Sequence, residues 1–281
     1  MIASFDLDQY LNRIQYAGGR SVSLETLSAL HACHPAAIPF ENLDPLLGRP
    51  VRLDVDSLQR KLVADGRGGY CYEHNLLFAE ALKALGFIVT GLAARVAWNV
   101  PEGARRPRSH MLLRVEINGV SHIADVGFGG LTLTAPLRLE AGVEQTTPHE
   151  TFRLIREGRE FVQEARVREA WTALYRFTED EQDVSDYEVA NWYTSTHPES
   201  IFRRALMAAR ATREARYALL DGRLTIHNRN GATEQRVLRN GSELKMTLMD
   251  IFGIRPPDSA DLDTVLERLT REPAARQSVN P

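Results

Sequence analysis

The sequence predicts an α+β protein in three parts: a helical bundle at the N-terminus, a central β-sheet or β-barrel, and a mixed α/β part at the C-terminus. Helical periodicity dominates residues 1–86, β-favouring runs prevail in residues 87–195, and residues 196–281 mix the two patterns. The chain has 281 residues, of which 43% are hydrophobic and 25% are charged. These are the proportions of a soluble globular protein that can bury a sizeable core.

Four helices are expected in the first part. The first has one apolar face, formed by Leu7, Tyr10, Leu11 and Ile14. The second begins after the N-cap residue Ser23 and should end near Pro35, because proline lacks the N–H that a continuing helix needs. The third covers about residues 55–64. The fourth covers residues 71–85, where Gly86 can end it in a left-handed conformation.

Strands are expected after Gly86. The clearest signal is Asn118-Gly119, which joins β-favouring runs at 110–117 and 120–126 and is typical of a two-residue hairpin turn. Further strand-like runs cover residues 87–90, 94–98, 152–155, 161–167 and 171–177.

The last part alternates between helix and strand signals. Residues 187–211 are expected to be helical, and a hairpin around Asn230-Gly231 should span residues 223–238. A final helix carries Leu262, Val265, Leu266 and Leu269. The residues from Pro273 onward are expected to form a frayed tail.

Composition excludes several classes of function. The net charge of −3 argues against a general nucleic-acid surface. No apolar run approaches the roughly 18 residues of a membrane span, and the N-terminus lacks a signal-peptide pattern. With only two cysteines, Cys33 and Cys71, a disulfide framework and a cysteine-rich zinc site are excluded. We therefore expect a cytoplasmic protein without metal, nucleic-acid or membrane partners, and the oligomeric state stays open.

Cys71 is a candidate nucleophile. It follows the glycine-rich run Arg67-Gly68-Gly69-Tyr70 and opens a predicted helix. The positive end of the helix dipole and the free N–H groups there favour the thiolate over the thiol. The same N–H groups can receive an oxyanion. A buried, inert thiol is the alternative interpretation.

The predicted hairpin places a histidine and a carboxylate on one face. If Asn118 and Gly119 form a two-residue turn, His110 and Asp125 point to the same side. They are then diagonal neighbours with backbones about 7–8 Å apart, within reach of a His–carboxylate hydrogen bond. A base with its orienting carboxylate is what triad chemistry requires.

Other residues compete for these roles. His122 falls on the opposite face in this register, whereas His74 lies three positions after the candidate nucleophile on the same helix and stays an alternative base. Glu73 is expected to be a first-turn acid that the helix dipole stabilises. Cys33 lies in a His-Ala-Cys-His run that hints at metal binding. Since no fourth ligand accompanies the run, we interpret Cys33 as a buried thiol.

The sequence resembles the arylamine N-acetyltransferase family in four ordered motifs. These are Pro39 to Leu43 (PFENL), Arg67 to Asn75 (RGGYCYEHN), His110 ahead of a strand, and Asp125 to Gly129 (DVGFG). His110 follows Cys71 by 39 positions and Asp125 follows His110 by 15, as expected for this family. The likeness is strong over residues 5–136, and weaker through residues 152–154 and 191–202.

The resemblance implies a three-part fold of helical bundle, β-barrel and α/β lid, with a Cys-His-Asp triad like that of papain-like proteases and transglutaminases. It also implies ping-pong transfer of an acetyl group. Cys71 takes the group from acetyl-CoA and passes it to an arylamine, an arylhydrazine or an N-hydroxyarylamine. His110 would handle the proton, and Asp125 would orient and stabilise its ring.

Substrate contacts are expected on the same basis. The residues expected at the aromatic acceptor are Phe40, Tyr70, Phe128 and Phe202, and those expected at CoA are Gly127, Gly129 and Trp98. Trp98 is a candidate for stacking on adenine, with core packing as the alternative. Arg105, Arg106 and Arg108 are candidates for the CoA phosphates, and a solvated loop is the alternative there.

Three other functions are compatible with these residues. One is an amide synthase of the same fold that acts on a polyketide chain. Another is a thiol hydrolase or a transglutaminase-like enzyme with the same triad. The third is a binding module in which Cys71 is merely structural, and the ordered triad argues against it.

Overall fold

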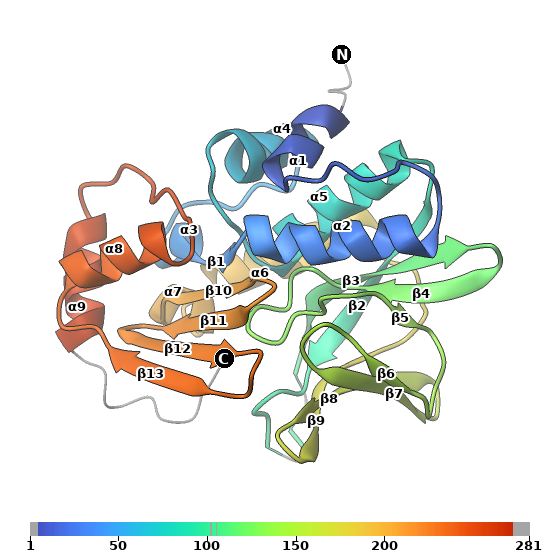
Figure 1. Cartoon of the computed structure of the whole chain (residues 1–281). Coiled ribbons are helices and arrows are strands. Elements are labelled where there is room, and N and C mark those ends of the chain that lie inside the picture. Colours follow the sequence, from blue (N-terminus) through green and yellow to red (C-terminus); the bar gives the residue numbers. More distant parts are fainter. Residues whose placement is uncertain (1–4, 102, 105, 272–281) are drawn as a thin grey trace.

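The computed structural model describes residues 5–101, 103–104 and 106–271. Helices from the first third of the chain form one layer, the middle forms an eight-stranded sheet, and a five-stranded sheet with helices beside it lies at the C-terminal end (Figure 1). The predicted α+β class is therefore confirmed. Among the described residues, no helix is long and apolar enough to cross a membrane.

The N-terminal helices begin where side chains cap them. Asp6, Ser23 and Asp54 each accept a hydrogen bond from a backbone N–H in the first turn. The prediction that the second helix ends near Pro35 was two residues short, because the buried Pro35 ring lies within its last turn. The helices are α1 (Leu7–Arg13), α2 (Leu24–Ala37), α3 (Leu43–Leu46), α4 (Val55–Leu58), the π-helix η1 (Gln59–Ala64) and α5 (Cys71–Ala84).

The eight-stranded sheet contains the predicted hairpin. Asn118 and Gly119 both have positive φ, of 51° and 77°, and Ile117 pairs with Val120 as the two-residue turn requires. The runs predicted at 87–90 and 94–98 form one strand. In spatial order the strands are β5 (Leu137–Arg138), β4 (Val120–Ala124), β3 (Arg108–Ile117), β2 (Ile88–Val96), β9 (Ala170–Phe177), β8 (Glu160–Val167), β7 (Thr151–Glu157) and β6 (Glu144–Thr146).

A side chain joins the two edge strands of this sheet. Gln145 of β6 accepts a hydrogen bond from the Arg138 backbone N–H of β5 at 2.7 Å and donates one to the Arg138 carbonyl at 2.9 Å. The amide thus takes the place of a strand pairing, and the sheet becomes barrel-like. Its interior is filled by apolar side chains such as Leu92, Leu112 and Phe152, each fully buried.

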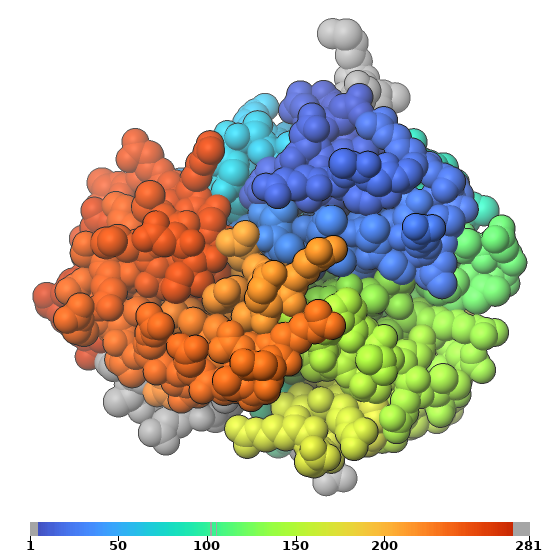
Figure 2. Space-filling model, in the orientation of Figure 1, coloured from blue at the N-terminus to red at the C-terminus, as the bar shows by residue number. Residues whose placement is uncertain are grey.

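The five-stranded sheet joins distant parts of the chain. Its edge strand β1 (Phe40–Glu41) comes from the helical layer and pairs with β10 (Met207–Ala211). The order continues with β11 (Ala215–Leu220), β12 (Arg223–Asn228) and β13 (Thr233–Val237). Helices α8 (Gly241–Asp250) and α9 (Leu262–Arg271) pack on this sheet, α7 (Ile201–Arg204) precedes β10, and α6 (Val184–Thr196) contacts β3 of the other sheet. Figure 2 shows this C-terminal part seated directly against the helical layer and the barrel.

The helical prediction for residues 187–211 was wrong at its end. Helix α6 stops at Thr196 and α7 at Arg204, and Met207–Ala211 form strand β10 between β1 and β11. Methionine, alanine and arginine are all good helix formers, so local propensity favoured helix. The strand prevails because backbone pairing on both sides and the burial of Ala208, Ala209 and Ala211 outweigh that propensity.

Asn42 fastens the C-terminal part to the helical layer. The fully buried Nδ2 donates to the carbonyls of Phe202 and Ala205, at 3.0 and 2.7 Å, and Oδ1 accepts from the Met207 N–H at 2.7 Å. One amide therefore satisfies three backbone groups at the turn into β10.

We expect Asn42→Ala to lower the free energy of unfolding by about 3 kcal/mol, because each backbone group left unpaired in the interior costs about 1–3 kcal/mol. Urea denaturation measures the change. The matched control is Asn12→Ala on the exposed face of α1, which should change the free energy by less than about 0.5 kcal/mol. Equal changes in the two variants would show that the Asn42 contacts contribute little.

Candidate active site

Cys71 is the first residue of α5, and the residues around it hold that helix start in place. The Glu73 side chain accepts a hydrogen bond from the Tyr70 N–H at 3.0 Å, as in a capping box. The Cys71 side chain is almost buried, and its Sγ lies 3.7 Å from the Ser109 carbonyl oxygen at the start of β3. The predicted position of the thiol at a helix N-terminus is confirmed.

The two glycines before this helix allow the chain to pass close to its neighbours. A Cβ on Gly68 would lie 2.0 Å from the Pro39 carbonyl oxygen, and one on Gly69 would lie 2.6 Å from Glu73 Oε2. This close approach lets the Glu41 N–H donate to the Gly69 carbonyl at 2.7 Å. Strand β1 is thereby fixed beside the start of α5.

The predicted contact between His110 and Asp125 is confirmed. His110 Nε2 lies 2.7 Å from Asp125 Oδ2, and both side chains are buried. Asp125 also accepts from Asn75 Nδ2 and from the Gly127 N–H, each at 3.0 Å. Its own N–H donates to His31 Nε2 at 3.0 Å. Three groups therefore hold the carboxylate, and His31 holds the backbone of the same residue.

His110 is protonated and Asp125 is ionised, so the two side chains form an ion pair. Burial alone would lower the pKa of His110, but the charge and hydrogen bond of Asp125, with a smaller contribution from Cys71, raise it to about 10. Burial would likewise raise the pKa of Asp125, and the contacts with His110, Asn75 and Gly127 lower it instead. The imidazole is therefore a cation at neutral pH, next to the thiol that opens α5.

His74 is occupied elsewhere. Its Nδ1 lies 2.9 Å from His34 Nε2, and its Nε2 faces the carbonyl oxygens of Pro39 and Gly69 at 3.2 and 3.0 Å. Burial lowers its pKa to about 4. Since both ring nitrogens are engaged, the structure does not support this alternative base.

The structure also shows where the other two candidates, His122 and Cys33, lie. His122 is 6% exposed on β4, with Nδ1 3.1 Å from the Val120 carbonyl oxygen, and takes no part in the site. Cys33 is a half-buried free thiol. Among the described residues, no group of three or more His, Cys, Asp or Glu side chains could hold a metal ion.

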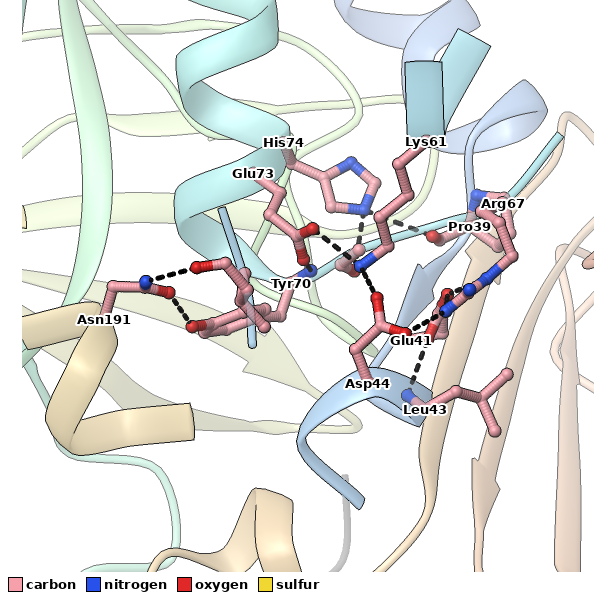
Figure 3. A network of polar contacts seen from close by, with 12 residues as sticks. Pro39, Glu41, Leu43, Asp44, Lys61, Arg67, Tyr70, Glu73, His74 and Asn191 are labelled. Atoms are coloured by element: carbon pink, nitrogen blue, oxygen red, sulfur yellow. Dashed lines mark hydrogen bonds and ion pairs between the residues drawn. The ribbon is translucent and has the colours of Figure 1, made fainter. Parts of the chain in front are cut away.

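A buried cluster of five charged residues supports the other side of α5 (Figure 3). Its carboxylates are Glu41, Asp44 and Glu73, and its cations are Lys61 and Arg67. Lys61 Nζ lies 2.6 Å from both Asp44 and Glu73, and Arg67 lies 2.7 Å from Glu41. Burial, together with the like charges of Asp44 and Glu41, raises the pKa of Glu73 to about 7 despite its contact with Lys61.

A cavity of about 370 Å³ opens onto the candidate nucleophile. Its volume suits a small ligand. It brings together seven of the other residues expected at the site: Phe40, Trp98, His110, Gly127, Phe128, Gly129 and Phe202. Arg106 also lines it, whereas Arg108 does not, and Arg105 lies outside the described residues.

Tyr70 lies behind the cavity wall rather than in it. Its side chain is fully buried, its hydroxyl donates to Asn191 of α6, and its ring centroid is 5.3 Å from that of Phe202. The expected direct contact between Tyr70 and a substrate therefore has no support in this structure. The residue joins the start of α5 to the C-terminal part and backs the Phe202 ring.

Gly127 has a packing role that the sequence did not reveal. A Cβ at this position would lie 2.9 Å from Cys71 Cα and 3.1 Å from the Cys71 carbonyl oxygen. The loop after β4 can therefore approach α5 only with glycine there. Asn75 and His31 were not predicted as site residues either. Asn75 belongs to the quoted RGGYCYEHN motif, whereas His31 had no local signal.

Several known N-acetyltransferases resemble this chain over most of its length. A family model described as N-acetyltransferase matches residues 23–259. The arylamine N-acetyltransferase of Mycobacterium tuberculosis is 44% identical over 280 residues, which cover 97% of this chain and 99% of that protein. The Salmonella typhimurium arylamine N-acetyltransferase / N-hydroxyarylamine O-acetyltransferase is 37% identical, with 96% and 98% covered.

Solved structures agree with this. The structure of Mycobacterium marinum arylamine N-acetyltransferase in complex with CoA has a TM-score of 0.91 to this chain at 42% identity. The match covers 94% of this chain and 99% of that one.

We expect iodoacetamide to alkylate Cys71 readily at pH 6.5, because the sulfur lies beside the His110 cation at a helix N-terminus. Asp125→Asn removes the charge that raises the pKa of His110, so the ring becomes neutral and alkylation at pH 6.5 should slow at least tenfold. Rates of alkylation across pH measure the effect. Glu73→Gln is the control and should leave the curve almost in place. Equal slowing in both variants would contradict the assignment of Asp125.

Stability should fall in mild acid because buried histidines are held neutral. Burial lowers the pKa of His31 and His74 to about 4, and that of His34 well below its ordinary value. Unfolded histidines bind protons near pH 6.5. The stability linked to the neutral rings is fully present above pH 6.5 and is lost as the pH falls from 6.5 through 4.

His34→Phe should therefore reduce the pH slope of the free energy of unfolding in this window by about 1.4 kcal/mol per pH unit. Urea denaturation at a series of pH values gives the slope. Asn12→Ala on the exposed face of α1, which removes no titratable group, is the control and should leave the slope unchanged. An unaltered slope in His34→Phe would mean that the ring is already charged in the folded protein.

Proposed function

The chain belongs to the arylamine N-acetyltransferase family, and we propose that Cys71, His110 and Asp125 are its catalytic triad. The protein is an acetyl-CoA-dependent acyltransferase that acetylates arylamines. The observation that carries the triad is the buried His110–Asp125 pair, 2.7 Å apart, in which His110 lines the same small cavity as a cysteine at a helix N-terminus. The comparisons favour this function over an amide synthase or a thiol hydrolase.

In the first half-reaction, the Cys71 thiolate attacks the thioester carbonyl of acetyl-CoA. The new C–S bond gives a tetrahedral oxyanion, and N–H groups at the start of α5 are suitably charged to stabilise it. Collapse breaks the bond to the CoA sulfur. The His110 imidazolium donates its proton to the departing thiolate, so free CoA leaves and an acetyl-Cys71 enzyme remains.

In the second half-reaction, the amine of the acceptor attacks the acetyl-Cys71 carbonyl. Neutral His110 takes the proton that the nitrogen loses, and collapse expels the Cys71 thiolate. Asp125 stabilises the imidazolium that forms again. The products are the acetylated amine and the enzyme in its starting state, so no external proton donor is needed over the cycle.

The cavity supports an aromatic acceptor. Phe40, Phe128 and Phe202 line it, and these rings can stack on or edge against an aryl group. We extend the acceptors to N-hydroxyarylamines, which the name of the Salmonella typhimurium relative includes. We also include arylhydrazines, because their terminal nitrogen is a comparable nucleophile.

The cavity also supports CoA as the donor, which the Mycobacterium marinum structure contains. Trp98 and Arg106 both line it. We propose that the indole packs on the donor and that the guanidinium contacts a phosphate. Gly127 and Gly129 also line the cavity, and we propose that their lack of side chains leaves room for the pantetheine arm.

Cys71→Ala and Cys71→Ser should abolish acetyl transfer while leaving the fold intact, because the nucleophile itself is removed. Intact-mass spectrometry after mixing wild type with acetyl-CoA should show one added acetyl group, mapped to Cys71 by peptide analysis. Cys33→Ala is the matched control and should retain both activity and acetylation. An acetyl group on Cys33, or loss of activity in His74→Ala but not in His110→Ala, would contradict the assignment.

A further inference from the structure

Arg216 of β11 lies where the C-terminal part meets the barrel. Its side chain is 3% exposed. Nε lies 2.8 and 2.9 Å from the two carboxylate oxygens of Glu150, and Nη2 lies 2.5 Å from Glu150 Oε2. This two-pronged pairing fixes the plane of the guanidinium. Glu150 belongs to the barrel, just before β7, so the pair bridges two parts of the fold.

The remaining donors of Arg216 reach the loop that lines the cavity. Nη1 donates to the Gly130 carbonyl at 3.3 Å and Nη2 to the Thr132 carbonyl at 2.9 Å. Gly130 and the residues before and after it, Gly129 and Leu131, line the cavity. A cation from the C-terminal part thus holds two backbone carbonyls of one wall of the site.

The same loop carries Phe128. The Phe128 N–H donates to Thr132 Oγ1 at 3.3 Å, so Thr132 links the position of this phenyl ring to the carbonyl that Arg216 holds. The ring lies 5.1 Å from the His110 ring and 5.1 Å from the Tyr175 ring, measured between centroids. Movement of the loop would therefore shift an aromatic wall next to the reacting atoms.

The charged groups of the triad are held by other contacts. The Asp125 carboxylate takes its hydrogen bonds from His110, Asn75 and the Gly127 N–H, and the Asp125 N–H donates to His31. The loop does touch this segment, since Thr132 Oγ1 donates to the Asp125 carbonyl at 3.0 Å. The contact from Thr132 involves the backbone carbonyl of Asp125 and none of the hydrogen bonds to its carboxylate.

We propose that Arg216, oriented by Glu150, is a positioning residue for the aromatic acceptor. It holds the Phe128–Thr132 loop so that the Phe128 ring forms one wall of the acceptor site, and it has no part in activating Cys71. The proposal rests on the function proposed above. It assigns to the C-terminal part a role in acceptor affinity that is separate from the thiol chemistry.

The test uses Arg216→Lys, which keeps the charge but cannot reproduce the planar fork. Glu150→Gln, which has the same shape but no charge, is the second variant. With saturating acetyl-CoA, KM for 4-methylaniline should rise about tenfold in Arg216→Lys and less in Glu150→Gln. The iodoacetamide alkylation curve should stay where it is in wild type. The matched control is Glu234→Gln, whose partner Arg236 forms an exposed pair on β13, and it should change neither quantity.

An unchanged KM in folded variants would overturn the proposal, as would a shift of the alkylation curve that accompanies the rise in KM. If thermal melting shows that Arg216→Lys does not fold, the test is the KM of Glu150→Gln for 4-methylaniline, which should still rise. Calorimetric titration of 4-methylaniline separates this proposal from the proposed function. Weaker binding in the variants supports the positioning role even if wild type transfers no acetyl group, whereas unchanged binding refutes it.

Discussion

The buried pair of His110 and Asp125 is the interaction on which the rest of the structure depends. Two charges in an apolar interior are tolerated only when each has close partners, because the cost of removing them from water is large. Two of the groups that hold Asp125 are distant in the sequence, Asn75 from α5 at the carboxylate and His31 from α2 at the backbone N–H, whereas Gly127 lies two residues further along the chain. The pair can therefore keep its partners only when the helical layer and the barrel are packed together.

The charged cluster on the opposite side of α5 also keeps buried charges next to partners of opposite sign, but its charges do not balance. Three carboxylates share two cations there, so one negative charge has no cationic counterpart within the cluster. Burial, together with the like charges of Asp44 and Glu41, therefore raises the pKa of Glu73. Both groups of charges act on a single helix end. His110 and Asp125 place a cation beside Cys71, while Glu73 and its neighbours fix where the helix begins.

The cavity is a product of all three parts of the chain. Phe40 comes from a strand that leaves the helical layer to join the C-terminal sheet, Phe128 from the barrel, and Phe202 from α7. Polar side chains, rather than extensive apolar packing alone, fasten these walls to one another. Asn42, Asn191 and Arg216 each satisfy partners in another part of the fold. Such directional contacts can hold a wall to within tenths of an ångström, which positioning a reacting amine requires.

The sequence by itself determined the features that depend on local chemistry. The Asn118-Gly119 turn and strand alternation fixed the register that brings His110 to Asp125, and the glycine-rich run predicted the helix start at Cys71. Tertiary structure alone decided what depends on distant partners. Met207–Ala211 became a strand because β1 and β11 flank it. Tyr70 lies behind the cavity wall because its hydroxyl donates to Asn191. Arg216 of the C-terminal part contacts the Phe128–Thr132 loop, which follows a strand of the barrel. Turns and helix starts depend on the backbone preferences of residues that are adjacent in the sequence, so a local pattern predicts them. The contacts of Tyr70, Arg216 and Met207–Ala211 join residues far apart in the sequence, and no local pattern indicates which residues will meet.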